Sequence, residues 1–136
     1  MTNNNTDPNK NEVQIRQLVE DWAEAVRTRD LQNILAHHSD DIVMYDVPTP
    51  FQSVGIDAYH KTWDIFFTYT KPGVFDIQQL RIFSDNNVAF CFATMKCADK
   101  TGSTDYIELD FRLTIGLKKL NGQWTIVHEH HSIPSE

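Results

Sequence analysis

The chain lacks features that would point to a membrane, a nucleic acid or a secreted location. No apolar run approaches the roughly 18 residues of a membrane-spanning helix. The opening stretch MTNNNTDPNKN is polar and lacks the charged-then-apolar order of a signal peptide. The 12 Lys and Arg are outnumbered by 19 Asp and Glu, and the formal net charge is -7, which excludes a dominant basic binding face. We therefore expect a cytoplasmic protein with no nucleic-acid or membrane partner.

Cysteines and cofactor motifs are equally scarce. The two cysteines, Cys91 and Cys97, lie in one predicted strand, which would place them roughly 20 Å apart. A disulfide needs Cα atoms within about 7 Å, so we expect two buried thiols. The sequence has no Gly-rich phosphate loop, nucleophile elbow, Cys-x-x-Cys motif or dinucleotide fingerprint. We therefore expect no cofactor.

The 136 residues are enough for one domain with its own core. We expect residues 1–10 to form a disordered arm and residues 11–134 to form the domain. Apolar residues at helical spacing predict a first helix over residues 12–28, with Asn11 and Gln14 resembling a capping box.

Two further helices are predicted from residues that are typical of helix starts and ends. Asp30 is placed to cap a short helix through LQNILAHH. A third helix begins after Gly55 and is stopped by the Lys-Pro-Gly sequence at residues 71–73.

Alternating residues predict strands in the remainder of the chain. These cover residues 40–47, 74–83, 88–97, 105–120 and 124–132. A slip at Gln78 and Gln79 suggests a bulge, and Asn121-Gly122 is typical of a hairpin turn. Residues 88–97 are apolar on both faces, which favours a central strand covered on both sides. Helices followed by a long antiparallel meander indicate an α+β fold, whose sheet must bend around the helices and leave a pocket.

The histidine-rich end, WTIVHEHHSIP, is the first candidate site. Strict alternation would place His128 and His130 on the face of Trp124, and Glu129 and His131 on the opposite face. A His-x-His pair suits zinc or iron, but a catalytic metal needs a third protein ligand, and no spacing supplies one. Two other interpretations remain open: histidines hydrogen-bonded near the end of the sheet, or one pocket histidine that binds or protonates a ligand. His130 is our candidate for that role.

Asp46 is the second candidate. It follows an apolar strand, and desolvation there would raise its pKa and suit it to act as a general base. It could equally face water or bond to the backbone of its loop. Arg112 could pair with Asp110 or bind an anionic ligand. Trp22 and Trp63 are expected in the core, although a buried indole N–H needs a partner and could donate into a pocket.

These stretches resemble the nuclear transport factor 2-like superfamily, especially its SnoaL-like and ketosteroid isomerase-like members. The resemblance covers about residues 11–134 and is carried by AVRTRD, LAHHSDDIVMYD, VGIDAYHKTW and NGQWTIVHEHHSIP in the family's order. The ending is also similar to the association domain of calcium/calmodulin-dependent kinase II. The resemblance implies a cystatin-like roll: a cone in which a strongly curved antiparallel sheet wraps around three N-terminal helices. It also implies a homodimer.

The resemblance extends to part of a catalytic site. Asp46 stands where ketosteroid isomerases have their proton-shuttling Asp. Their oxyanion-hole Tyr falls on Trp22, and their second donor, a protonated Asp, falls near Thr114, so the base position is matched and the oxyanion hole is not. Steroid isomerisation by the family's mechanism is therefore not expected.

The sequence leaves two functions open. The first is a pocket for a small, partly apolar molecule, with cofactor-free proton transfer of the isomerase, cyclase or dehydratase type. Asp46 and His130 would be catalytic there, and no metal is expected. The predicted ligand-binding residues are Trp22, Tyr45, Trp63, Arg112, Thr114 and His128. The alternative is a non-catalytic module that binds small carboxylates or mediates oligomerisation.

Overall fold

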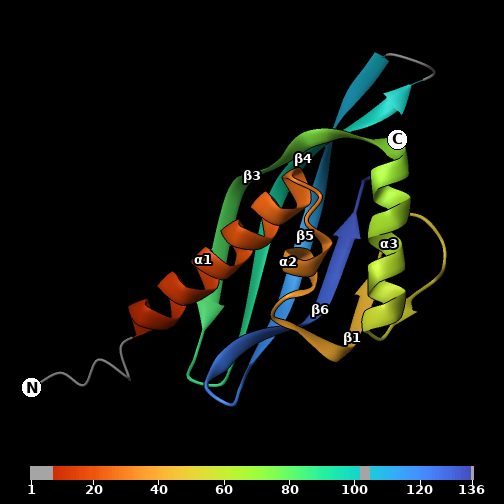
Figure 1. Cartoon of the computed structure of the whole chain (residues 1–136). Coiled ribbons are helices and arrows are strands. Elements are labelled where there is room, and N and C mark those ends of the chain that lie inside the picture. The colour runs from red at the N-terminus through yellow and green to blue at the C-terminus, as the bar shows by residue number, and fades with distance from the viewer. Residues whose placement is uncertain (1–7, 102–104, 136) are drawn as a thin grey trace, which may run out of the picture.

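The computed structural model describes residues 8–101 and 105–135 (Figure 1). The helices are α1 (Pro8–Arg27), α2 (Leu31–Leu35) and α3 (Ile56–Tyr69). The strands are β1 (His38–Tyr45), β2 (Ser53–Val54), β3 (Thr70–Ser84), β4 (Val88–Thr101), β5 (Asp105–Leu120) and β6 (Gln123–Ser132). No helix within the described ranges is long and apolar enough to cross a membrane.

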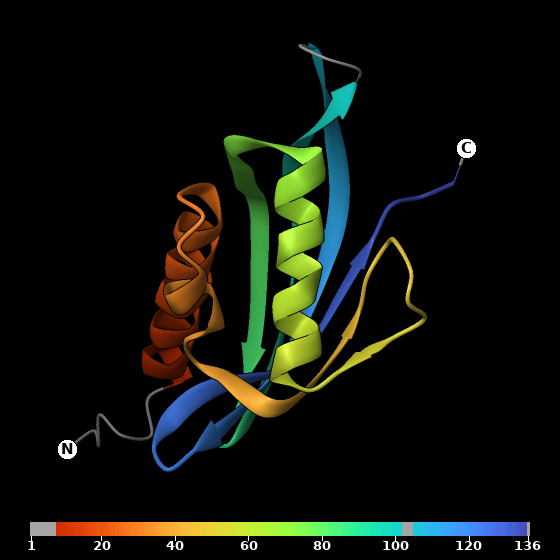
Figure 2. The same cartoon turned by 45° about the vertical axis from the view of Figure 1, so that its right-hand side comes forward.

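The strands form one curved, open sheet in the order β2-β1-β6-β5-β4-β3. Helices α1 and α3 lie against one face of this sheet (Figures 1 and 2). The predicted α+β fold with a curved sheet around N-terminal helices is therefore confirmed. The sheet is mixed rather than wholly antiparallel, because β1 pairs with β6 in parallel while the other neighbours are antiparallel.

The first helix buries the apolar stripe that its spacing predicted. Ile15, Val19 and Trp22 on this stripe are at most 2% exposed. The helix begins at Pro8, a residue favoured in the first turn, so residues 8–10 of the predicted arm are helical. The rest of that arm lies outside the described residues. Asn11 is inside the helix, so the capping-box prediction is wrong. Its side-chain amide donates to the backbone carbonyl of Asp85, between β3 and β4, and accepts from Lys119 near the end of β5.

Turns and caps follow local chemistry. The carboxylate of Asp30 accepts a hydrogen bond from the backbone N–H of Asn33 and caps α2, as predicted. Helix α3 ends at Tyr69, just before the Lys-Pro-Gly sequence, and Gly73 has a φ of +87°. The β5–β6 turn is confirmed at Asn121 and Gly122, both with positive φ.

The long strands place their buried side chains toward the helices. The predicted bulge in β3 is confirmed by a register shift between Ile77 and Gln79. Cys91 and Cys97 are buried, unpaired thiols on β4, and burial raises the pKa of each to about 12. The prediction that β4 is covered on both sides is wrong, since Phe90 and Phe92 on its other face are 49% and 40% exposed. We call that uncovered side of the sheet the outer face.

Candidate functional site

A bulge in the last strand decides which of its polar residues face the core. The register between β5 and β6 shifts after Gly116, which pairs with His128, while Leu117 pairs with Ile126. Val127 is therefore an extra residue, and the side-chain alternation reverses beyond it. Ile126 before the bulge is fully buried, and so is Glu129 after it. The predicted alternation is therefore wrong past Ile126: Glu129 and His131 face the core, and His130 faces outward.

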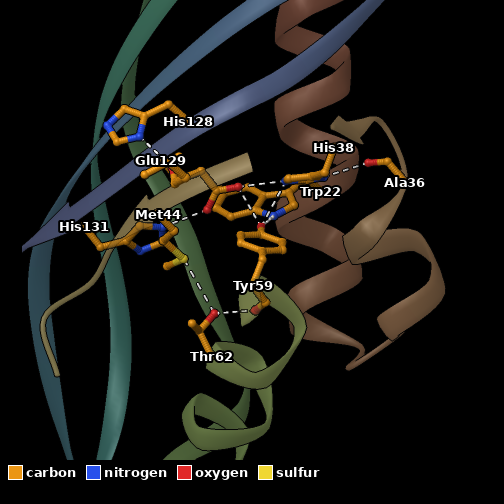
Figure 3. Close-up of polar contacts among 10 residues, drawn as sticks. Trp22, Ala36, His38, Met44, Tyr59, Thr62, His128, Glu129 and His131 are labelled. Carbon is orange, nitrogen blue, oxygen red and sulfur yellow. Dashed lines mark hydrogen bonds and ion pairs between the residues drawn. The ribbon is translucent and has the colours of Figure 1, made fainter. Parts of the chain in front are cut away.

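Glu129 is the centre of a buried polar network (Figure 3). Its Oε2 accepts a hydrogen bond of 2.6 Å from the hydroxyl of Tyr59 on α3. The same oxygen lies 2.8 Å from Nε2 of His38 on β1. The other carboxylate oxygen, Oε1, lies 3.0 Å from Nε2 of His131. Trp22 on α1 closes the network, because its indole N–H donates to the Tyr59 hydroxyl over 3.1 Å.

The hydrogen bonds of this network fix where the protons lie. Nδ1 of His38 is 2.9 Å from the carbonyl oxygen of Ala36, which can only accept, so Nδ1 carries a hydrogen. Burial, followed by the nearby Glu129 carboxylate, raises the pKa of Tyr59 well above its usual value, so its hydroxyl keeps its hydrogen and donates it. One further proton must then lie between His38 Nε2 and Glu129.

The low pKa of Glu129 means that the carboxylate does not carry that proton. Burial by itself would raise the pKa of Glu129, but hydrogen bonds from His131 and His38 and their charges outweigh burial and lower it to about 2. The carboxylate is therefore ionised, and His38 and Glu129 form an ion pair whose side chains are fully inaccessible to solvent. Such a pair is costly to desolvate and is held by the surrounding hydrogen bonds.

The same carboxylate orients His131. Because Oε1 of Glu129 can only accept, Nε2 of His131 carries a hydrogen, and the neutral form of the ring would have its lone pair on Nδ1. No other described residue forms a hydrogen bond with that ring. Phe111 stacks on it with ring centroids 5.8 Å apart, and Trp22 and Trp63 are edge-on to it with centroids 6.3 Å away. The imidazole is thus fixed in position by aromatic contacts and a charged acceptor.

His131 lines a cavity of about 290 Å³ between α3 and the sheet. The cavity is mainly apolar, with Phe66 and Phe111 among its walls. Two carboxylates, Asp46 and Asp99, also line it. Burial raises the pKa of Asp99 above its usual value. An oriented imidazole, carboxyl groups and apolar walls are the components of a candidate acid–base site.

A larger, open groove of about 830 Å³ runs along α1 and α2. Its three carboxylates are occupied locally: Asp21 accepts from Gln17, Glu24 pairs with Arg27, and Asp30 caps α2. We therefore take the smaller cavity as the candidate site. Among the described residues, no group of three or more His, Cys, Asp and Glu side chains is arranged to hold a metal ion.

The predicted site residues are distributed over three places. Asp46 reaches the cavity, and its Oδ1 also accepts from the backbone N–H of Val47. Trp22 and Trp63 are 2% exposed and belong to the core, where Nε1 of Trp63 has no partner among the described residues. The remaining five lie on the outer face or its edge: Tyr45, Arg112, Thr114, His128 and His130.

These five do not meet the cavity. Tyr45 contacts the rings of His128 and His130 at 4.7 Å and 5.4 Å. Nδ1 of His128 lies 2.6 Å from the Val43 carbonyl oxygen. Arg112 bonds to Ser132, and none of the described carboxylates, Asp110 included, forms an ion pair with it. The site predicted from sequence therefore combines residues from both sides of the sheet.

Sequence reasoning missed four residues of the network: His38, Tyr59, Glu129 and His131. One signal was present for the last two. Gly116 interrupts the strand RLTIGLKKL, and an interior strand glycine often marks a bulge. A bulge opposite Gly116 would have moved Glu129 and His131 to the inner face. Nothing local in the sequence signals Tyr59, which lies 70 positions from Glu129.

Comparison with known proteins agrees with this architecture. A family model for the SnoaL-like domain matches residues 15–136. A crystal structure of an NTF2-like protein of unknown function from Pseudomonas putida KT2440 is 34% identical, with a TM-score of 0.84 over 94% of this chain and 89% of that one. No curated protein matches the chain.

More distant structures share the fold alone. A ketosteroid isomerase-like protein from Erwinia carotovora atroseptica SCRI1043 is 17% identical, with a TM-score of 0.76 over 91% of this chain and 96% of that one. A candidate calcium/calmodulin dependent protein kinase II association domain from Xanthomonas campestris is also 17% identical, with a TM-score of 0.75 over 90% and 86%. Together with the family match over most of its length, the curved sheet and its helices show that this chain belongs to the SnoaL-like domain family.

Proposed function

We propose that the protein binds a small, partly apolar molecule in the cavity beside α3 and moves a proton on it without a cofactor. The observation that carries this proposal is the His131 ring, held by a buried, ionised Glu129 at the wall of an apolar cavity. A base of this kind suits isomerase, cyclase or dehydratase chemistry. The fold relationship to a ketosteroid isomerase-like protein is compatible with it but does not establish the reaction.

The proposed chemistry follows from the lone pair that a neutral His131 ring has on Nδ1. Nδ1 of His131 would take a proton from a carbon next to a carbonyl group, leaving an enolate. The imidazolium would then return the proton to another carbon, or to a departing hydroxyl group in a dehydration.

Asp46 is the competing base, because it lines the same cavity. The two candidate bases, Asp46 and His131, differ in their hydrogen-bond partners. Asp46 already accepts a hydrogen bond from the neighbouring backbone, whereas Nδ1 of His131 has no partner among the described residues. This difference favours His131 as the base and Asp46 as a group at the cavity wall.

Replacing His131 with glutamine is expected to slow proton transfer by about 10²–10⁴-fold. Glutamine can still donate to Glu129, but it has no basic lone pair. The measurement is the loss of α-proton NMR signals from a panel of small ketones in D2O. Arg112→Ala, on the outer face, is the matched control and should exchange at the wild-type rate.

The outcomes separate the candidates. Loss of exchange in Asp46→Asn together with wild-type exchange in His131→Gln would move the base to Asp46. A protein that binds ketones but exchanges no proton would favour the non-catalytic alternative. Loss of ligand binding in Arg112→Ala alone would move the site to the outer face, where small carboxylates are the expected ligands.

We also propose that the protein is a homodimer that pairs through the outer face. Phe90 and Phe92 are about half exposed there, and both stack near Phe83 at 5.1 Å and 6.0 Å. Such an aromatic surface is costly to leave in water, which supports an interface on this face. Phe90→Lys is expected to give a monomer in size-exclusion chromatography with light scattering. Phe51→Lys, on the loop between β1 and β2, should remain dimeric, and a Phe90→Lys variant that also does would contradict this interface.

A further inference from the structure

The mouth of the cavity is surrounded by apolar side chains that remain exposed. We call this set the collar, and it consists of Val47, Pro48, Ile65, Tyr69 and Ile133. The loop after β1, the helix α3 and the segment after β6 each contribute to it, and Figure 2 shows the loop and that segment extending on the same side of α3. Tyr69 is 64% exposed and Val47 is 52% exposed. Because these residues converge from three separate segments, they are more than scattered surface apolar residues.

The collar is continuous with the cavity, since its members also line it. At about 290 Å³ the cavity lies at the small end of ligand pockets, which span roughly 300–1,000 Å³. A ligand of ordinary size would fill it and project outward across the collar. The apolar surface there would then be covered by the ligand itself.

The charges of the cavity restrict the ligand further. No Lys or Arg is among the described residues that line it, whereas Asp46 and Asp99 are. An anionic group would therefore meet carboxylates and no cation. The cavity therefore favours an uncharged polar group over an anion.

We infer that the ligand is an uncharged molecule with one polar end and an apolar tail longer than the cavity, and that the tail crosses the collar. The placement of the polar end rests on the proposed function, because that function brings the carbon next to the carbonyl to Nδ1 of His131. The apolar tail is inferred from the collar alone, and the lack of charge is inferred from the residues that line the cavity.

The test is the affinity of a ketone series, measured by calorimetry with 2-butanone, 2-pentanone, 2-heptanone and 2-nonanone. Each buried methylene should tighten binding by about fourfold, and the gain should continue to the longest ketone. In the double variant Ile65→Ser/Tyr69→Ser, the gain between 2-heptanone and 2-nonanone should disappear. Val13→Ser, an exposed apolar residue on α1 outside the collar, should keep the wild-type gain. Nonanoate should bind at least about tenfold more weakly than 2-nonanone.

Several results would overturn this inference. The first is an affinity that stops rising at a short ketone, and the second is a collar variant that keeps the wild-type gain in affinity from 2-heptanone to 2-nonanone. The others are nonanoate that binds as tightly as 2-nonanone, and no binding of any ketone. A dimer that dissociates when Ile65 and Tyr69 become serine would show that a second copy covers the collar, and would also overturn it.

The same ketones separate this inference from the proposed function. Affinity that rises with chain length without α-proton exchange would remove the proton-transfer proposal and leave the ligand class standing. Proton exchange that depends on His131, together with an affinity that does not depend on chain length, would keep the proton-transfer proposal and remove the ligand class.

Discussion

Replacing Glu129 with glutamine is expected to lower the free energy of unfolding by about 3–5 kcal/mol. The change removes the negative charge that faces His38 at 2.8 Å, in a place where neither side chain touches solvent. The imidazolium would then have no counterion, or would have to lose its proton and with it the hydrogen bond to the carboxylate. A domain of this size is stable by only about 5–15 kcal/mol, so the loss should be obvious.

The measurement is urea unfolding at neutral pH with the m value compared between variants. The matched control is Glu108→Gln, because Glu108 is an exposed partner of Lys96 on the neighbouring strand. An exposed pair of this kind contributes about 0–1 kcal/mol. A loss for Glu129→Gln no larger than for the control would mean that the buried pair is not ionised.

A double variant tests the pairing itself. His38→Gln/Glu129→Gln should be more stable than the sum of the two single losses predicts, because it leaves no unpaired charge. Tyr59→Phe removes one donor to the carboxylate and keeps the ring, so it should cost less than the loss of Glu129. Additive losses for the His38 and Glu129 variants would contradict the ion pair.

The parts of the fold that could be predicted from sequence are those set by local chemistry. Asp30 caps a helix whose first N–H groups need acceptors, and Asn121-Gly122 adopts the positive φ angles of a tight hairpin. The strand over residues 105–120 was predicted with both its boundaries. Residues 107–117 alternate without a proline and without a charge on the apolar side. Each of these features depends on only a few neighbouring residues.

The candidate site depends instead on one inserted residue and on distant partners. Strict alternation assigned His130 to the pocket, and the bulge at Val127 reversed that assignment for every residue after it. His38 was assigned to the end of a helix, whereas it begins β1 and meets Glu129 from 91 positions away. Asp46 was placed near a pocket for a local reason, its position after an apolar strand, and it does line the cavity.

The network also links stability to the proposed chemistry. Glu129 makes an ion pair with His38 through one oxygen and orients His131 through the other. Any change that neutralises this carboxylate should therefore both destabilise the fold and release the His131 ring. The two effects can be separated by His131→Gln, which removes the base and keeps a donor to Glu129.

Acid is expected to neutralise the same carboxylate and to destabilise the protein by roughly 3 kcal/mol through this group alone. The pKa of Glu129 is lowered from 4.5 to about 2 in the folded state, although burial opposes that shift, because His131 and His38 hydrogen-bond to the carboxylate. A lowered folded pKa gives stability that is fully present above about pH 4.5 and is lost as the pH falls toward 2. Urea unfolding between pH 6 and pH 2.5 should therefore show a steeper loss in the wild type than in Glu129→Gln, which has no such carboxylate to protonate. Equal slopes would show that Glu129 is no more acidic in the folded chain than in the unfolded one, and would remove the basis for an ionised carboxylate that orients His131.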